Sequence, residues 1–317
     1  AGAQSVSYPS ASQALQRYGG VEVDPRQIQR MVNERGPKLA KVLDQPGRNQ
    51  EVASAPIMYV SMDATGVPMT GKELEGRRGK QPDGSAKTRE VKLGCVFTQH
   101  HVDEKGRPWR DLDSTTYVAG LEKAQDFGHR IRREAERRKV FQAPKLILLG
   151  DGAHWIWELA NTHFPHAIQV LDFYHASEHL KLLAEALEPT DPGKVRALLE
   201  HWQQCLKEDR LDQIIAESLS RMPQHGPRKK AADAQLAYLE NNRMRMQYGT
   251  FQKRGWFIGS GVIEAGCKTV IGQRLKQSGM FWSLPGAQNI LTLRCATSSR
   301  RFDQAWDRLQ PQLPLAA

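Results

Sequence analysis

The chain has 317 residues, four cysteines and a net charge of +10, from 45 Lys and Arg against 35 Asp and Glu. This length supports a large core and two or three structural units. No C-x-x-C clip or disulfide framework is evident, which favours a reducing cytoplasm. No signal peptide or run of 18 apolar residues occurs, which excludes a helical membrane span. The basic excess favours a polyanionic partner, with nucleic acid as one candidate. The first residue is Ala1 rather than Met, which is compatible with a processed or truncated chain.

The N-terminal segment, residues 1–50, predicts two short helices within residues 10–36. For the second helix, Asp24 is the expected cap, Pro25 the first helical residue and Gly36 the stop. The spacing of the two helices resembles a helix-turn-helix remnant, and an ordinary helical hairpin fits equally well. We therefore treat residues 1–50 as a separate helical segment.

The next part of the chain predicts a mixed sheet. Strands are expected at 55–69, 91–99 and 114–120, followed by a helix at 121–139. The apolar runs "KLILLGDGAHWIW" and "AIQVLDFYHASEHL" each predict a buried strand that leads into a helix. Three antiparallel strands followed by alternating strands and helices are the element order of the ribonuclease H fold, with helices on both faces of the sheet.

The same order of strands and helices sets the expected domain limits. We expect residues 51–180 to form the first part of this ribonuclease H-like core and residues 181–250 to form an all-helical insertion. Residues 251–317 then supply the final catalytic helix and the C-terminal helices. The fold class predicted is α/β, with the small N-terminal helical segment added to it.

Three carboxylates occupy related places in this scheme. Asp63 lies on the first strand, Asp151 closes the fourth, and Glu264 lies near the start of the final helix. In a ribonuclease H-like fold these positions converge at one sheet edge, where carboxylates suit Mg²⁺ or Mn²⁺, and two such ions support phosphodiester chemistry. Taken singly, each residue is equally explained as a helix cap, a turn former or a partner of the helix dipole.

The stretch 175–179 reads H-x-x-E-H and raises a second possibility. His175 and His179 are four residues apart, so on a helix both could reach one zinc ion, with Glu178 beside them, as in inverted zinc peptidases. Glu264 could formally be the third ligand. This interpretation is the less favoured one, because it leaves the two aspartates and the basic segments unexplained.

Four blocks of the sequence carry a family resemblance: "SMDATGVP", "LGDGAHWIW", "LDFYHASEHL" and "GSGVIEAGCKTVIGQRLKQSGMFWS". Together they resemble DDE transposases of bacterial insertion sequences, most closely the ISKra type and more distantly the Mutator-like group, over about residues 55–300. The resemblance implies that Asp63, Asp151 and Glu264 are the catalytic, metal-binding triad. It also implies a supporting role for Asp172 and His175, which match an Asp-x-x-His motif.

The resemblance further implies an activity. The protein would bind the ends of a mobile DNA element, cleave a strand with a metal-activated water, and transfer the freed 3′-hydroxyl into target DNA. Joining two ends implies a homo-oligomer. The location expected for a bacterial transposase is the cytoplasm, in association with the nucleoid. Only about 50 residues precede the first strand, so a domesticated or truncated DNA-binding protein that does not cleave is the alternative.

Basic side chains are the expected phosphate contacts. Lys268 lies four residues after Glu264 and so shares its helix face, which makes it the strongest candidate. A solvated helix face is the ordinary alternative for any single one of the others. The further predicted DNA-binding residues are Arg274, Lys276, Arg228, Lys229, Lys230, Arg77 and Arg78.

Overall fold

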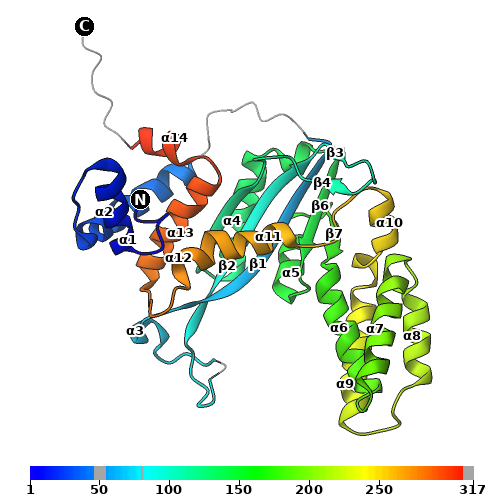
Figure 1. The fold of residues 1–317 in the computed structure, drawn as a ribbon. Helices are drawn as coiled ribbons and strands as arrows, with labels where there is room; N and C mark the ends of the chain where they lie inside the picture. Colours follow the sequence, from blue (N-terminus) through cyan, green and yellow to red (C-terminus); the bar gives the residue numbers. More distant parts are fainter. Residues whose placement is uncertain (46–54, 80, 310–317) are drawn as a thin grey trace.

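The computed structural model describes residues 1–45, 55–79 and 81–309, and a five-stranded mixed sheet lies at its centre (Figure 1). The strand order is β5-β2-β1-β6-β7. β1 (Ile57–Pro68) runs antiparallel to β2 (Thr88–Gln99), which runs antiparallel to β5 (Thr116–Gly120). On its other side β1 is parallel to β6 (Lys145–Gly150), and β6 is parallel to β7 (Ile168–Leu171). The predicted α/β class with a mixed sheet is therefore confirmed.

β1 and β2 extend well beyond the rest of the sheet. Their pairing continues to Pro68 and Thr88, whereas the pairing of β1 with β6 ends at Ser61. The two strands thus form an arm, which ends in α3 (Gly71–Leu74) and a loop (Figure 1). At the opposite end, β3 (His101–Val102) and β4 (Pro108–Trp109) form a small hairpin.

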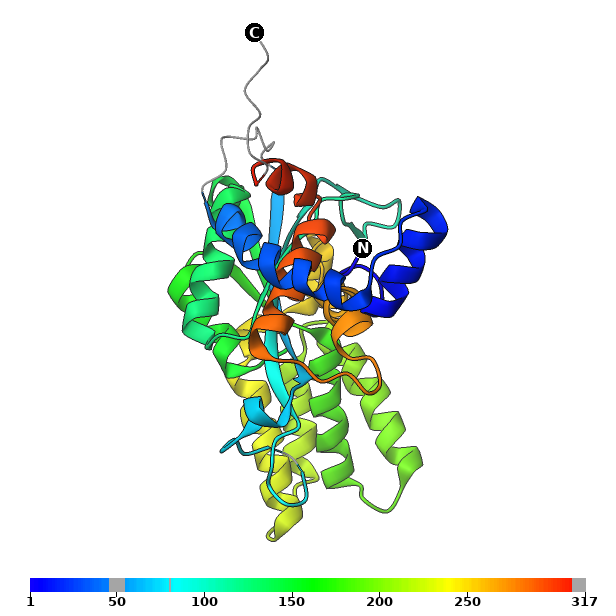
Figure 2. The same ribbon diagram turned by 90° about the vertical axis from the view of Figure 1, so that its left-hand side faces the viewer.

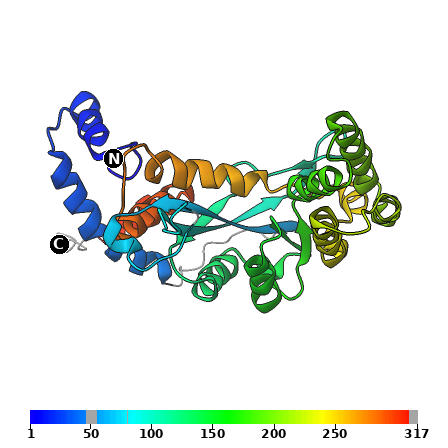
Figure 3. The same cartoon turned by 90° about the horizontal axis from the view of Figure 1, so that it is seen from below.

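Helices cover both faces of the sheet, because the strand side chains alternate between them. A Cβ on Gly94 of β2 would come within 2.7 Å of Ile131 of α4, while a Cβ on Gly266 would come within 3.0 Å of Leu93. Figure 3 shows the two layers on opposite sides of the strands. One layer holds α4 (Ala124–Arg137), the short helix Val140–Gln142 and α5 (His154–His163); the other holds α11 (Gly261–Gly266), the π-helical turn Cys267–Gly272, α12 (Gln273–Leu275) and α13 (Leu284–Ser298).

A helical block leaves the sheet at the end of β7. Its first helix, α6, runs from Phe173 to Leu187 and so crosses the predicted boundary at residue 181. Apolar side chains such as Trp202, Leu206 and Leu239 are buried between its helices. The other members are α7 (Pro192–Lys207), α8 (Leu211–Ser220), α9 (Pro227–Asn241), the short helix Arg243–Arg245 and α10 (Tyr248–Lys253).

The N-terminal helices are α1 (Tyr8–Gly19) and α2 (Pro25–Asp44). The expected cap is confirmed, because the Asp24 side chain accepts a hydrogen bond from the Arg26 N–H at 2.8 Å. The expected stop at Gly36 is wrong, since α2 continues through Gly36 and Pro37 to Asp44. α2 packs along α13 (Figure 2), and this tertiary packing outweighs the local stop signal.

Parts of the predicted domain limits fall outside the described residues. The boundary between residues 50 and 51 lies in 46–54, and the end of the C-terminal unit lies in 310–317. Within the described ranges, the last helix is α14 (Phe302–Asp307), and no helix is long and apolar enough to cross a membrane.

The contact between α2 and α13 gives a testable prediction. A Cβ on Gly36 would lie 2.8 Å from the Asn289 side chain, so Gly36→Ala should destabilise the protein by about 1–3 kcal/mol through overpacking. Gly19 has nothing within 4 Å of an added Cβ, so Gly19→Ala should be neutral or stabilise by about 0.5 kcal/mol. Urea unfolding of both variants compares the two sites, and equal free energies of unfolding would contradict the packing argument.

Candidate functional site

The sheet register brings three aspartates to one level. The last pair between β1 and β6 joins Ser61 to Leu149, and two residues further this register sets Asp63 beside Asp151. The last pair between β6 and β7 joins Gly150 to Leu171, and one residue further it sets Asp151 beside Asp172. Neighbouring strands lie about 4.8 Å apart, and side chains at one level of parallel strands share a face. All three carboxylates therefore belong to the face that α11 covers.

Asp63 and Asp151 interact electrostatically. Burial raises the pKa of the Asp63 carboxyl above its ordinary value, and the negative charge of Asp151 raises it further. Three groups lower this pKa: the Ala64 N–H, which donates to Asp63 Oδ1 at 2.6 Å, the Cys267 thiol, and the His175 side chain through its charge. Asp151 Oδ1 accepts the Ala153 N–H at 2.9 Å, which shapes the turn into α5. Two carboxylates that raise each other's energy in this way form a site that a cation would stabilise.

Asp172 links the sheet to the helix that carries Glu264. Its side chain is fully buried, and Oδ1 caps α6 by accepting the His175 N–H at 2.8 Å. Oδ2 accepts the Ser260 N–H at 2.5 Å, just before α11 begins. The Ser260 hydroxyl then donates to the Glu264 carboxylate at 3.0 Å. Asp172 is thus a positioning residue for Glu264, while His175 contributes its backbone to the same link.

Glu264 lies partly buried on α11, and its carboxylate accepts a hydrogen bond from Ser260. Within residues 1–45, 55–79 and 81–309, no three His, Cys, Asp or Glu side chains are grouped so that they could hold a metal ion. The register sets Asp63 and Asp151 beside each other. Glu264 lies on α11, where Ser260 holds its carboxylate.

Cys267 is a member of the site that sequence reasoning missed. Its thiol donates to Asp63 Oδ2 at 3.3 Å, and burial together with the Asp63 charge raises the pKa of the thiol far above its usual range. The thiol is therefore neutral and acts as a donor. The available signal was its position three residues after Glu264, which puts both on one helix face.

A π-helical turn follows directly, from Cys267 to Gly272. Such wide turns are often found at functional sites, and they need partners for the carbonyls that they displace. The buried Arg294 of α13 supplies them, because its guanidinium donates to the carbonyls of Val270 at 2.7 Å and of Thr269. A third bond reaches the Ala3 carbonyl at 2.7 Å. α13 thereby fixes the irregular turn in place.

The basic residues near Glu264 differ in exposure. Lys268 is exposed, as a phosphate contact requires, and Lys276 is exposed and donates to the Thr65 hydroxyl, two residues beyond Asp63 on β1. Arg274 needs correction as a DNA contact, because it is only 1% exposed. Its guanidinium lies over the rings of Tyr8 and Trp282, at 4.6 and 4.8 Å from their centroids. Arg274 is therefore part of the packing between α12 and the N-terminal segment.

The other basic candidates lie at the two projecting ends of the molecule. Arg228 donates to the last carbonyls of α6 at 3.0 and 2.8 Å, so part of its role is to cap that helix. Lys229 pairs with Asp233 at 2.7 Å. Three residues are exposed and stay predictions as DNA contacts: Lys230 near the start of α9, and Arg77 and Arg78 beyond the β1–β2 arm.

The H-x-x-E-H stretch lies in α6, and its two histidines have different neighbours. His175 Nδ1 lies 3.5 Å from a Glu178 oxygen. The His179 ring stacks on Tyr238 of α9, with centroids 3.4 Å apart, and its Nδ1 lies 2.7 Å from Gln235 Oε1. This arrangement gives His179 a packing role between α6 and α9.

Tyr238 brings the helical block to the candidate site. A Cβ on Gly152 would lie 2.1 Å from the Tyr238 hydroxyl, so that oxygen touches the residue that follows Asp151. The hydroxyl is buried without a hydrogen-bond partner among the described residues. Burial, reinforced by the charge of Asp151, raises the pKa of Tyr238 to about 12. Sequence reasoning had no signal for this contact, because it joins residues far apart in the chain.

Comparison with known proteins gives little further guidance. No family model matches the chain, and no curated protein matches it. Among solved structures, the strand transfer complex of the Drosophila P element transposase is similar at 11% identity, with 94% of this chain and 84% of that chain covered. The TM-score is 0.26, which is too low for any conclusion about fold or function.

The link through Asp172 predicts a large loss of stability. Asp172→Ala would leave the buried N–H groups of His175 and Ser260 without an acceptor, which should cost about 2–4 kcal/mol. Asp191→Ala is the matched control, since Asp191 caps α7 at an exposed site and should cost about 1 kcal/mol. Chemical unfolding measures both, and a loss for Asp172→Ala no greater than for Asp191→Ala would contradict the link.

The buried Tyr238 hydroxyl, which has no hydrogen-bond partner among the described residues, predicts that its removal does not destabilise the protein. Tyr238→Phe keeps the ring that stacks on His179 and removes a buried polar group, so the free energy of unfolding should stay level or rise by about 1 kcal/mol. Thermal unfolding checks this, with Tyr248→Phe, whose hydroxyl is also buried without a described partner, as the control away from Gly152. A clear destabilisation of Tyr238→Phe alone would mean that its hydroxyl has a stabilising partner.

Proposed function

We propose that the chain is a DNA transposase of the DDE type, similar to those of bacterial insertion sequences of the ISKra type. The observation that carries the proposal is the register that sets Asp63 beside Asp151 on neighbouring parallel strands, on the face covered by the Glu264 helix. The strand order, with three antiparallel strands followed by two parallel ones, supports a ribonuclease H-like assignment. The substrate proposed is DNA, as transposon ends and as target.

The donor set of the site suits a hard divalent cation. Mg²⁺ is commonly held by one or two carboxylates, with waters and substrate phosphates completing the coordination. Asp63 and Asp151 would supply such a pair, and their mutual repulsion is what a cation would relieve. Glu264 would be the third ligand. When bound, Mg²⁺ or Mn²⁺, proposed as two ions, supplies Lewis-acid stabilisation and an activated water for phosphodiester cleavage.

The protein's own residues would orient the DNA. Asp172 and Ser260 hold Glu264 near the aspartates. Lys276, anchored on Thr65, places a positive charge beyond Asp63, where it would bind a backbone phosphate. Lys268 is the second such contact. A 3′-hydroxyl bound in the same place would then attack target DNA, which requires two ends and hence an oligomer.

A second function is favoured by the engagement of Glu264 with Ser260 and by the lack of a three-ligand group within the described residues. In that case the chain would be a domesticated or truncated DNA-binding protein that does not cleave. Its DNA affinity would not depend on divalent metal. Cleavage by the transposase would require the metal.

The deciding experiment is Mn²⁺ binding measured by calorimetry, together with cleavage of supercoiled and oligonucleotide DNA in Mg²⁺, Mn²⁺ or EDTA. Asp63→Asn and Glu264→Gln should each weaken Mn²⁺ binding and abolish cleavage. Glu200→Gln, on the exposed side of α7, is the matched control and should change neither. DNA binding without metal-dependent cleavage in the wild type would favour the non-cleaving protein.

The raised pKa of Asp63 adds a prediction about pH. The folded-state pKa lies above the unfolded one, so the charged carboxylate is disfavoured in the fold, and the penalty develops as pH rises through the folded pKa. Without metal, Asp63→Asn should therefore melt at a higher temperature than the wild type at pH 7. The difference should vanish near pH 3, below the ordinary Asp pKa of about 3.9. Calorimetric scans across this range test it, and a gap that widens towards acid would contradict the sign.

A further inference from the structure

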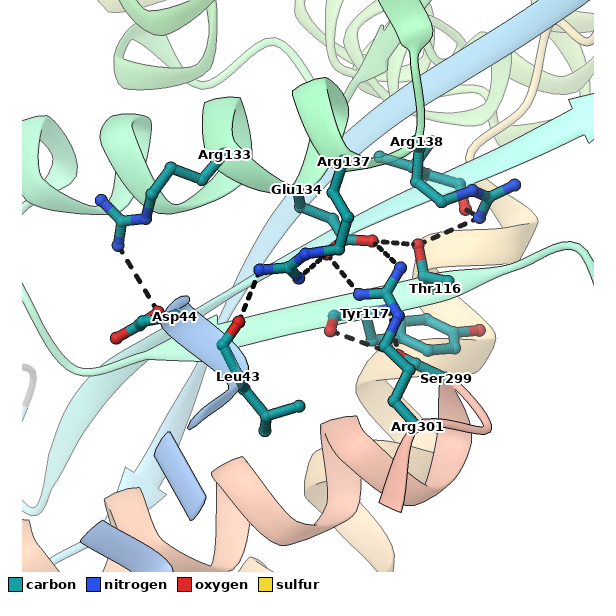
Figure 4. A network of polar contacts seen from close by, with 11 residues as sticks. Leu43, Asp44, Thr116, Tyr117, Arg133, Glu134, Arg137, Arg138, Ser299 and Arg301 are labelled. Atoms are coloured by element: carbon teal, nitrogen blue, oxygen red, sulfur yellow. Dashed lines mark hydrogen bonds and ion pairs between the residues drawn. The ribbon is translucent and has the colours of Figure 1, made fainter. Parts of the chain in front are cut away.

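A small cavity lies at the β5 edge of the sheet, opposite the β7 edge where the helical block begins. Its volume is about 60 Å³, and it is bordered by α2, α4, β5 and the end of α13 (Figure 4). We call it the arginine pocket, because four guanidinium side chains line it together with two carboxylates: Arg130, Arg133, Arg137, Arg301, Glu134 and Asp44.

Glu134 is the buried centre of the arginine pocket. Its side chain is 0% exposed, and one oxygen accepts from Arg137 at 2.8 Å and from Arg301 at 2.6 Å. The other oxygen accepts from Arg301 at 2.8 Å and from the Thr116 hydroxyl at 2.6 Å. Both oxygens are thus fully used, so Glu134 has no capacity left to neutralise a further guanidinium.

The positive charge around the pocket exceeds the negative charge. Arg138 is buried beside Glu134, yet it donates to the uncharged oxygens of Ser114 and Thr116, at 2.6 and 3.1 Å. Burial lowers the pKa of Arg137 and of Arg138. The charge of Glu134 acts in the opposite direction, and the charge of Arg301 lowers both further. Three guanidiniums therefore share one carboxylate among the described residues.

The two outer arginines do not correct this surplus. Arg130 pairs with Glu122 at 2.6 Å, and Arg133 reaches Asp44 only at 3.7 Å, with both partners about half exposed. The five arginines of this region, counted against Glu122, Glu134 and Asp44, leave a net charge of +2 among the described residues, and Arg138 has no carboxylate contact of its own there. Buried charge of one sign is costly unless a counter-charge joins it.

We propose that the arginine pocket binds one tetrahedral oxyanion of the phosphate class, either free phosphate or a phosphate of a nucleic-acid backbone. Guanidinium groups match such oxygens through paired, charge-assisted hydrogen bonds. The cavity has room for several waters, which is enough for one phosphate group. The proposal rests on the charge surplus at the β5 edge and is independent of the function assigned to Asp63 and Asp151.

The test is calorimetric titration of the purified protein with sodium phosphate in a chloride buffer of matched ionic strength. The wild type should bind one phosphate per chain. Arg130→Gln combined with Arg133→Gln should weaken binding by about tenfold or more, because charge-assisted hydrogen bonds are lost while the buried Glu134 cluster is untouched. Arg196→Gln, which removes a positive charge from the exposed face of α7, should bind as the wild type does.

Asp44→Asn gives a test with the opposite sign, which a folding defect would not produce. Removing the carboxylate near Arg133 should tighten phosphate binding and increase the rise in melting temperature that phosphate causes. Absence of phosphate binding in the wild type, or equal affinity in the wild type and the double arginine variant, would overturn the proposal.

The source of the phosphate is distinguished by repeating the comparison with a short DNA duplex. If the backbone supplies the group, the double arginine variant should lose duplex affinity and phosphate should compete with DNA. If free phosphate is the ligand, the phosphate titration should still distinguish the variants while duplex affinity does not. The triad variants Asp63→Asn and Glu264→Gln should lose metal-dependent cleavage. Their phosphate and duplex titrations should match those of the wild type, which separates this proposal from the proposed function.

Discussion

The arrangement of the candidate site depends on a single buried carboxylate. Asp172 is placed by the end of β7, and its two oxygens accept the N–H groups that begin α6 and precede α11. Asp172 thereby joins the end of β7 directly to the turn that carries Glu264. A charged acceptor with two backbone donors is among the stronger interactions available inside a protein, because the donors are held by their helices and need no rearrangement.

Near Asp172, other groups of the site have unfavourable electrostatic surroundings. Asp63 and Asp151 raise each other's energy, and the Tyr238 hydroxyl is buried against Gly152 without a described partner. The packing that compensates comes from elsewhere, from the π-helical turn held by Arg294 and from the aromatic rings around Arg274. Such a distribution, with stability in the support and strain at the site, is typical of functional centres.

The sequence was most informative where local patterns and the final structure agree. Apolar runs predicted β1, β6 and β7. Asp151 and Asp172 directly follow β6 and β7, whose parallel ends meet at one edge, and Asp63 lies inside β1 at the same level. Local patterns failed where distant segments decide. α2 passes through Gly36 because α13 packs there, and Arg274 is buried because Tyr8, from the N-terminal segment, folds over it. Tyr238 reaches the site only through the tertiary fold, which no spacing in the chain specifies.

The same link at Asp172 has a consequence for the history of the chain. The Phe173 N–H donates to the Ile258 carbonyl at 2.9 Å, so the helical block leaves the sheet and returns to it at adjoining residues. The entropy of closing a loop between two such points grows only slowly with its length. Exchange of the block for a shorter or longer one would therefore leave the geometry of its two ends nearly unchanged. Related proteins could in this way acquire different helical blocks on an unaltered sheet.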